Sequence, residues 1–170
     1  MIMEWVVLAG LGLAVMGAAS TGAIYKPGAW YETLEKPPWT PPNWLFPVAW
    51  LVLYILMTVA GWRVVTALAA GSLAAPMTAA AGVAFWAAQI TLNAIWSPLF
   101  FGIRRPDAAM ICVVALWLAV AASCGLFWMV DPLAGAMLLP YVAWVTVAAA
   151  LNWTVLRMND DTKWGLPDAA

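Results

Sequence analysis

The sequence predicts an all-α membrane protein, built as a bundle of five transmembrane helices. Hydrophobic residues make up 66% of the 170 residues and charged residues only 9%, whereas about a quarter of the residues in a soluble domain are charged. Five uncharged stretches reach the roughly 20 residues that a helix needs to cross a bilayer. A soluble domain with so few charges would expose large apolar patches to water. The composition therefore argues against a soluble enzyme, and a net charge of −1 provides no basic surface for nucleic acid.

The five predicted helices follow one another through residues 1–170, which we interpret as a single integral membrane domain. The first is interpreted as a retained span because Glu4, rather than a basic cluster, precedes its apolar run. The second follows a proline-rich segment. The uncharged run over residues 64–103 is too long for one span, and a turn-forming segment between Gly71 and Pro76 divides it. Two arginines precede the fourth helix, and an Asp-Pro pair separates it from the fifth. The predicted helices cover residues 5–25, 44–65, 77–101, 108–130 and 132–156.

The distribution of lysine and arginine predicts the orientation in the membrane. Short loops that carry excess positive charge stay on the cytoplasmic side. Six of the seven cations fall on one side of the predicted bundle, and Arg63 falls on the other. The six are Lys26, Lys36, Arg104, Arg105, Arg157 and Lys163. We therefore expect the first loop and the C-terminus to be cytoplasmic, in either an inner or an outer membrane.

The first loop, residues 26–43, is the longest predicted connection. Four of the six residues that follow Lys36 are prolines, which remove backbone donors and make the segment stiff and extended. Long ordered loops in compact domains are often lids. The aromatic residues Trp30, Tyr31 and Trp39 favour a lid over a passive linker, although both interpretations stay open at this point.

Aromatic and amide side chains recur at helical spacing on three of the predicted helices. An amide in hydrocarbon is costly unless it is paired, so these faces should point toward protein or a cavity. The up-and-down order of the helices brings the three faces to similar depths below the first loop. This pattern predicts an aromatic pocket for a flat, poorly soluble ligand; the alternative is that the amides only join helices and the tryptophans only pack. The residues are Phe46, Trp50 and Tyr54; Trp86, Gln89, Asn93, Trp96 and Phe100; and Tyr141, Trp144, Ala148 and Asn152.

The sequence lacks the residues that several kinds of catalytic and metal-binding site require. The chain contains no histidine, so metal sites, nucleophile pairs and haem ligation that depend on histidine are excluded. Cys112 and Cys124 lie about 18 Å apart along a helix, beyond disulfide reach, and are expected to be buried apolar residues. We expect no catalytic residues, no metal and no cofactor. Any function must therefore rely largely on aromatic surfaces, chiefly those of the 13 tryptophans, and on amides and hydroxyls.

Small residues repeat at every fourth position on two of the predicted helices, a pattern that allows close helix approach. The first set is Gly10, Ala14, Ala18 and Gly22, and the second is Ala80, Ala84 and Ala88. Because the approach can occur inside the bundle or between subunits, the repeats predict a homodimer only as one of two alternatives.

Four motifs, in order along the chain, carry a resemblance to a known family. They are Lys36-Pro-Pro-Trp-Thr-Pro-Pro; Phe46-Pro-Val-Ala-Trp50 with Leu53-Tyr54; Asn93-Ala-Ile-Trp96-Ser-Pro-Leu-Phe-Phe-Gly102; and Leu139-Pro-Tyr-Val-Ala-Trp144 leading to Leu151-Asn152-Trp153. Together they resemble the translocator protein family, whose members are also called tryptophan-rich sensory proteins or peripheral-type benzodiazepine receptors (TspO/MBR). The resemblance covers nearly the whole chain, and the composition suits a bacterial member.

The resemblance implies a five-helix bundle that binds tetrapyrroles such as protoporphyrin IX, and also sterols and isoquinoline or benzodiazepine drugs. Trp50 and Trp144 match the paired tryptophans that flank the ligand in the family. The other matching positions are Tyr54, Asn93 and Trp96 in the pocket, Ala148 in sterol response, and Trp39 on the lid. Two departures are that Trp153 replaces the tyrosine of the animal sterol pattern, which puts cholesterol in doubt, and that Pro38 replaces an aromatic residue of some relatives.

The leading functional hypothesis is a membrane receptor or sensor that binds porphyrin and regulates its level. Without histidine, a free-base porphyrin fits better than haem. A passive transporter of porphyrin or cholesterol is one alternative, because the predicted spans lack the central charges of ion-coupled transport. Light-dependent degradation of porphyrin is a second alternative, as a side activity rather than an enzyme function of the usual acid–base kind.

Overall fold

Five long helices dominate the structure, a computed structural model that describes residues 2–165. They are α1 (Ile2–Ile24), α3 (Leu45–Ala69), α4 (Pro76–Ser97) with its π-helical continuation η1 (Pro98–Gly102), α5 (Pro106–Val130) and α6 (Pro132–Met158). The short helices α2 (Ala29–Thr33) and η2 (Asp161–Lys163) lie outside these spans. All five long helices are long and apolar enough to cross a membrane. The predicted fold class, an all-α bundle of five transmembrane helices, is confirmed.

The observed helix ends differ from the predicted ends by a few residues. Three helices begin with a proline, at Pro76, Pro106 and Pro132. Proline lacks a backbone N–H, but at the start of a helix this N–H would have no partner within the helix, so nothing is lost. The second predicted span continues to Ala69, and Gly71, two residues further on, has a φ of 64°. A side chain is strained in that left-handed conformation, and glycine tolerates it.

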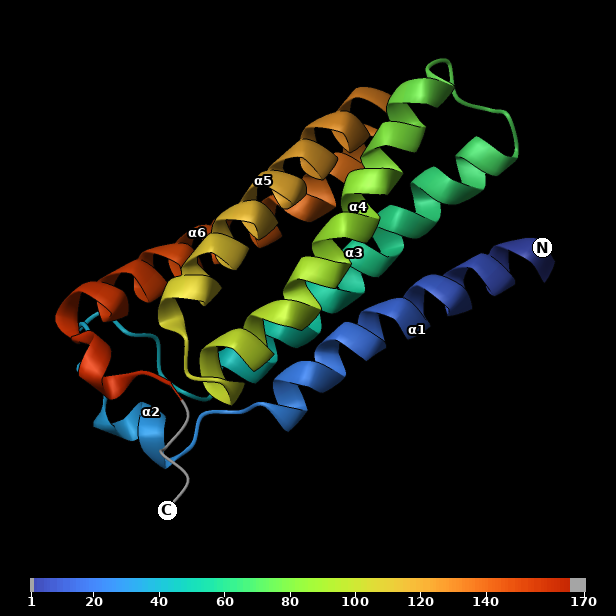
Figure 1. Cartoon of the computed structure of the whole chain (residues 1–170). Helices are drawn as coiled ribbons and strands as arrows, with labels where there is room; N and C mark the ends of the chain where they lie inside the picture. Colours follow the sequence, from blue (N-terminus) through green and yellow to red (C-terminus); the bar gives the residue numbers. More distant parts are fainter. Residues whose placement is uncertain (1, 166–170) are drawn as a thin grey trace.

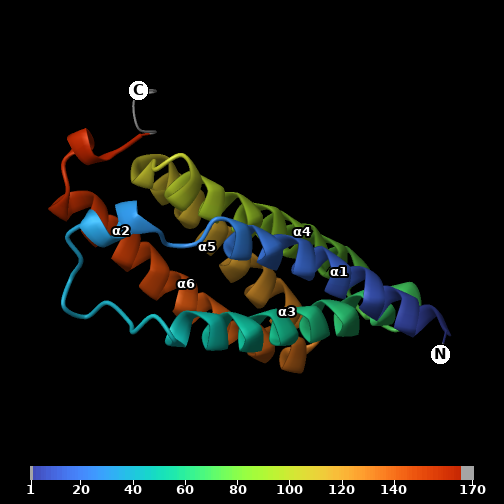
Figure 2. The ribbon, with the colours of Figure 1, turned by 90° about the horizontal axis from the view of Figure 1, so that it is seen from below.

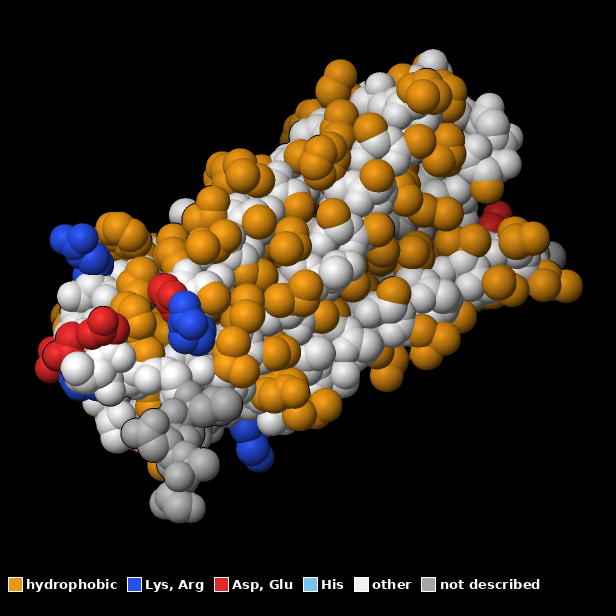
Figure 3. Space-filling view, in the orientation of Figure 1, with side chains coloured by type: hydrophobic (Ala, Val, Ile, Leu, Met, Phe, Trp, Pro, Cys, Tyr) orange, Lys and Arg blue, Asp and Glu red, His pale blue; other side chains and the backbone are white. Residues whose placement is uncertain are grey.

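The helices form one bundle in which α5 packs against both α4 and α6, and α1 packs against α3 and α4. Figures 1 and 2 show the same two ends of this bundle from different sides. The helix α2 and the chain after α6 gather at one end, whereas the N-terminus and the α3–α4 connection lie at the other. Figure 3 shows hydrophobic side chains along the length of the helices and charged side chains mainly at the end that carries α2.

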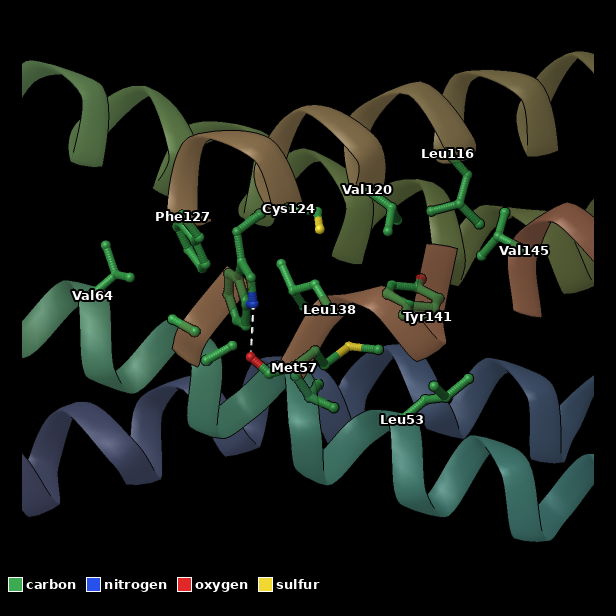
Figure 4. Close-up of a cluster of buried hydrophobic side chains, with 14 of the residues drawn as sticks. Leu53, Met57, Val64, Leu116, Val120, Cys124, Phe127, Leu138, Tyr141 and Val145 are labelled. Atoms are coloured by element: carbon green, nitrogen blue, oxygen red, sulfur yellow. Dashed lines mark hydrogen bonds between the residues drawn. The ribbon is translucent and has the colours of Figure 1, made fainter. Parts of the chain in front are cut away.

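The buried core runs along the contacts of α3, α4, α5 and α6, and Figure 4 shows its central part. Met57, Phe127 and Tyr141 are almost fully buried there. The indole N–H of Trp86 donates a hydrogen bond of 2.9 Å to the backbone carbonyl of Met57. At Gly135 a Cβ atom would lie 2.6 Å from the backbone of Trp128, so the absence of a side chain lets α5 and α6 approach closely.

Candidate ligand site

Three helices meet at a set of side chains in contact with one another, which we call the interior cluster: Trp50, Tyr54, Asn93 and Tyr141. The Tyr54 hydroxyl donates to Oδ1 of Asn93 at 3.3 Å, and Nδ2 of Asn93 donates to the Tyr141 hydroxyl at 3.2 Å. Asn93 is 8% exposed and Tyr141 is 1% exposed. Because no water is available in the membrane interior, these pairings satisfy groups that would otherwise be costly to bury.

The aromatic rings of the interior cluster are arranged face to face and edge to face. Trp50 stacks on Tyr54 with the ring centroids 5.2 Å apart, and it meets Tyr141 edge-on at 6.0 Å. Trp50 and Tyr54 lie one turn apart on α3, so the helical spacing itself brings their rings together. The cluster therefore combines flat apolar surfaces with one amide that can orient a polar group.

A second group of residues lies where α4 continues into η1. The indole N–H of Trp96 donates to Oδ1 of Asn152 at 3.2 Å, and Nδ2 of Asn152 donates to the carbonyl of Pro106 at 2.9 Å. Trp96 also stacks on Phe100 with a centroid distance of 5.0 Å. These predicted site residues thus join α4, α5 and α6.

Trp144 and Ala148 lie half-buried on α6. The ring of Trp144 meets Phe46 edge-on, with the centroids 5.6 Å apart, and both Trp144 and Trp50 pack against the same buried core. The two tryptophans that resemble the family's ligand-flanking pair therefore come from facing helices, α6 and α3.

Gln89 occupies the position one turn from Asn93 on α4, and it is 1% exposed. Its Nε2 has a long contact of 3.9 Å to the sulfur of Met57, and its Oε1 has no hydrogen-bond partner in the described part of the chain. A buried acceptor without a donor is uncommon in folded proteins and calls for an explanation.

The first loop packs onto the end of the bundle through residues that the sequence analysis did not assign to the site. Tyr31 and Leu34 are buried against Phe100 and Val155. Asn159 accepts the backbone N–H of Glu35 at 2.9 Å and donates to its carbonyl at 3.0 Å. Trp39, the predicted lid residue, is 48% exposed.

These contacts tie the loop to the chain that follows α6. A further bond links them, from the indole N–H of Trp30 to the carbonyl of Lys163 at 2.6 Å. Asn159 lies beyond the predicted end of the fifth helix, and the alternation of polar and charged residues there gave no signal of a buried contact. An aromatic residue followed at i+3 by leucine, as in Tyr31 and Leu34, was the available signal for the packed side of the loop.

The described residues 2–165 contain no group of three or more Cys, Asp or Glu side chains that could hold a metal ion. Cys112 and Cys124 are both buried free thiols, and each donates a weak hydrogen bond to a backbone carbonyl. The chemistry of the described interior is accordingly that of aromatic faces, amides and hydroxyls.

The model of the TspO/MBR family matches residues 5–158 of this chain. Protein CrtK of Rhodobacter capsulatus is 53% identical over 86% of this chain and 88% of its own length. The tryptophan-rich sensory protein of Cereibacter sphaeroides is 39% identical over 99% of both chains. The translocator protein of Sus scrofa is 35% identical over 80% of this chain and 78% of its own length. The matched range contains every helix that contributes to the interior cluster.

Proposed function

The chain belongs to the TspO/MBR family, and we propose that it is a membrane receptor that binds tetrapyrroles such as protoporphyrin IX at the interior cluster. It is an integral multi-pass membrane protein with five apolar spans. Binding of porphyrin by this receptor would couple the porphyrin level to a response.

The interior cluster is the observation that carries this proposal. Trp50 offers a stacking partner already paired at 5.2 Å with Tyr54, and an aromatic pair contributes about 0.5–1.5 kcal/mol beyond the burial of its area. Asn93 supplies both an amide donor and an acceptor at the same place. Apolar walls with few orienting polar groups are typical of sites for small organic ligands.

The charge distribution supports an orientation for the ligand. A protoporphyrin macrocycle is flat and apolar, and its two carboxylates are grouped along one edge. Six of the seven lysine and arginine residues lie at the end of the bundle that carries α2, so we expect the carboxylates to face that end. The proposed ligand-binding residues are Trp39, Trp50, Tyr54, Gln89, Asn93, Trp96, Tyr141, Trp144, Ala148 and Asn152.

Trp39 and Ala148 play different parts in this proposal. Trp39 is exposed and would have to fold inward from the loop to meet a ligand. Ala148 is half-buried one turn beyond Trp144 on α6, and we expect its small side chain to limit how closely a ligand can approach less than a larger one would. Sterols and isoquinoline drugs share the flat apolar character of porphyrin and are expected to use the same surfaces.

We also propose that the chain forms a homodimer. Ala80, Ala84 and Ala88 are all exposed on α4, and such a face allows two helices to approach closely. On α1 the repeat is divided, because Ala18 is buried inside the bundle whereas Gly10 is exposed. The face of α4 is thus the better candidate for contact between subunits.

A titration of the detergent-solubilised protein with protoporphyrin IX, in the dark, tests the binding function. We expect saturable quenching of tryptophan fluorescence at micromolar or lower porphyrin. The double variant Trp50→Phe/Trp144→Phe should lose the saturable phase, because it removes both proposed stacking partners. The matched control is Trp44→Phe/Trp153→Phe, which removes two tryptophans that are 66% and 51% exposed, and it should bind like the wild type.

Two results would contradict the proposal. Linear quenching that is identical in all three proteins would mean that porphyrin only partitions into the detergent. Saturable binding that survives in Trp50→Phe/Trp144→Phe would move the site away from these helices. The same samples, illuminated afterwards, report whether porphyrin is consumed in light.

A further inference from the structure

A groove of about 460 Å³ lies between α1 and α3. Both helices are candidate membrane spans. The groove is therefore at a depth where the surrounding medium is hydrocarbon. Its lining residues are Leu8, Gly12, Val15, Met16 and Ala19 from α1, and Leu51, Tyr54, Ile55, Thr58 and Val59 from α3.

The two polar side chains that line this groove both have their hydroxyl donors engaged inside the protein. The Tyr54 hydroxyl is turned to Asn93 at 3.3 Å, and the Thr58 hydroxyl donates to the carbonyl of Tyr54 at 2.7 Å. The remaining lining side chains are aliphatic or thioether groups. An occupant would therefore gain only dispersion and packing contacts, which favours a saturated chain over a ligand with polar groups.

The volume of the groove fits one such chain. A methylene group takes up about as much space as a water molecule in the liquid, roughly 30 Å³. A groove of about 460 Å³ therefore has room for a run of methylene groups such as that of a lipid acyl chain.

We propose that the groove binds one acyl chain of a bilayer lipid, and that Tyr54 makes this chain compete with the ligand of the interior cluster. The acyl-chain site stands on the groove alone, whereas the competition rests on the proposed function. Tyr54 belongs to both places, because it lines the groove and its hydroxyl is bonded inside the bundle.

The competition follows from the packing around Trp50. Its ring centroid is only 5.2 Å from that of Tyr54, so a third aromatic ring cannot enter between the two faces. A ligand that stacks on this face of Trp50 must displace Tyr54. Tyr54 also lines the groove, so a chain that fills the groove restrains Tyr54 and opposes this displacement.

Two glycines of α1 provide a matched pair of variants. Gly12 lines the groove, whereas Gly17 is exposed on α1 and does not line it. A Cβ atom added at either position meets nothing within 4 Å, so both positions accept leucine without a clash at that atom. The leucine of Gly12→Leu fills part of the groove, and the leucine of Gly17→Leu points outside it.

Native mass spectrometry of protein released from nanodiscs of dioleoylphosphatidylcholine tests the acyl-chain site. We expect the wild type and Gly17→Leu to retain one phospholipid per chain, and Gly12→Leu to lose it. Equal retention by Gly12→Leu and Gly17→Leu would overturn the site, as would a wild type released without lipid.

The competition is tested with protoporphyrin IX added to the same nanodiscs. Porphyrin should displace the retained phospholipid from the wild type. Gly12→Leu should bind porphyrin about tenfold more weakly, because its leucine fills the groove in place of the lipid and, being part of the chain, cannot be displaced; Gly17→Leu should be unchanged. Equal porphyrin affinity of the two variants would overturn the competition. If the wild type binds no porphyrin, the proposed function fails instead, and the lipid count alone decides the acyl-chain site.

Discussion

Gln89 and Asn93 lie one helical turn apart on α4, yet their amides differ in how far they are satisfied. Asn93 accepts a hydrogen bond from the hydroxyl of Tyr54 and donates one to the hydroxyl of Tyr141. Gln89 has only the sulfur of Met57 at 3.9 Å, and its Oε1 has no partner within residues 2–165. An unpaired buried acceptor lowers stability, and residues that lower stability are often retained for function.

Replacing Gln89 by methionine should therefore separate stability from binding. Gln89→Met removes the unpaired acceptor and keeps the length of the side chain, so we expect thermal stability in detergent to stay the same or to rise by about 1 kcal/mol. Affinity for protoporphyrin IX should fall, because the acceptor is then absent from the proposed site. Thermal unfolding and the fluorescence titration measure the two effects.

The comparison variant is Asn93→Leu, which leaves two tyrosine hydroxyls in the bundle without the amide that now joins them. It should lower stability by about 1–3 kcal/mol. A loss of stability in Gln89→Met as large as in Asn93→Leu would show that the amide of Gln89 is satisfied in the folded protein, contrary to our interpretation.

For single residues, the sequence predicted which helix faces carry the aromatic and amide side chains, but not which of these side chains bond to one another. The spacing of Gln89 and Asn93 on one helix and of Trp50 and Tyr54 on another follows from helical periodicity. Which groups bond across helices depends on how far each helix is rotated, and packing sets that rotation. The pairing of Trp96 with Asn152 could not be read from spacing for this reason.

The start of α6 is defined by Asp131. Its carboxylate accepts the backbone N–H groups of Leu133 and Ala134 and a hydrogen bond of 2.8 Å from Nε of Arg63 on α3. Partial burial alone would raise the pKa of Asp131, but the hydrogen bonds from Arg63, Ala134 and Leu133 and the positive charge of Arg63 outweigh it, and the net shift of the pKa is downward.

This shift predicts a loss of stability in acid. Because the pKa of Asp131 is lower in the folded chain than in the unfolded chain, its contribution is complete above the unfolded value of about 3.9 and disappears as the pH falls through the folded value. Arg63 is partly exposed, so we expect the ionised pair to contribute about 1 kcal/mol at neutral pH. Thermal unfolding of wild type and Asp131→Asn should differ at pH 7 and converge below about pH 4.

Asparagine keeps an acceptor for the first turn of α6, so Asp131→Asn isolates the charge. Asp131→Ala also removes the cap and should be about 1 kcal/mol less stable than Asp131→Asn at every pH. A difference between wild type and Asp131→Asn that stays constant from pH 7 to pH 3 would contradict the role of the ion pair.

The elements themselves were largely predictable because charges, glycines and prolines interrupt the apolar runs. Pro76 and Pro132 lie within a residue of the predicted helix starts. The predicted end of the fifth span, at residue 156, lies two residues before the observed end of α6 at Met158. Hydropathy marks only the edge of the apolar run, whereas the helix continues through Arg157 into the membrane boundary. The π-helical turn η1 has no marker in the hydrophobic pattern.

The whole molecule has two chemically different ends. The end with α2 carries six of the seven lysine and arginine residues and the two hydrogen bonds between Asn159 and the backbone of Glu35. At the other end the single cation, Arg63, is paired with Asp131. The sequence predicted this division of charge. It could not predict the hydrogen bonds between Asn159 and Glu35, because these residues lie 124 positions apart in the chain.

The division of charge predicts which end faces the cytoplasm. Since lysine and arginine hinder translocation of the short loops that carry them, the end with α2 should stay inside. A green fluorescent protein fused to the C-terminus in a bacterial inner membrane should fluoresce, and an alkaline phosphatase fused there should be inactive. The same reporters inserted after Ser72, in the α3–α4 connection at the opposite end, should give the reverse pattern. Active phosphatase at the C-terminus would show that insertion follows something other than the six cations, and the proposed approach of porphyrin carboxylates to that end would then occur from outside the cell.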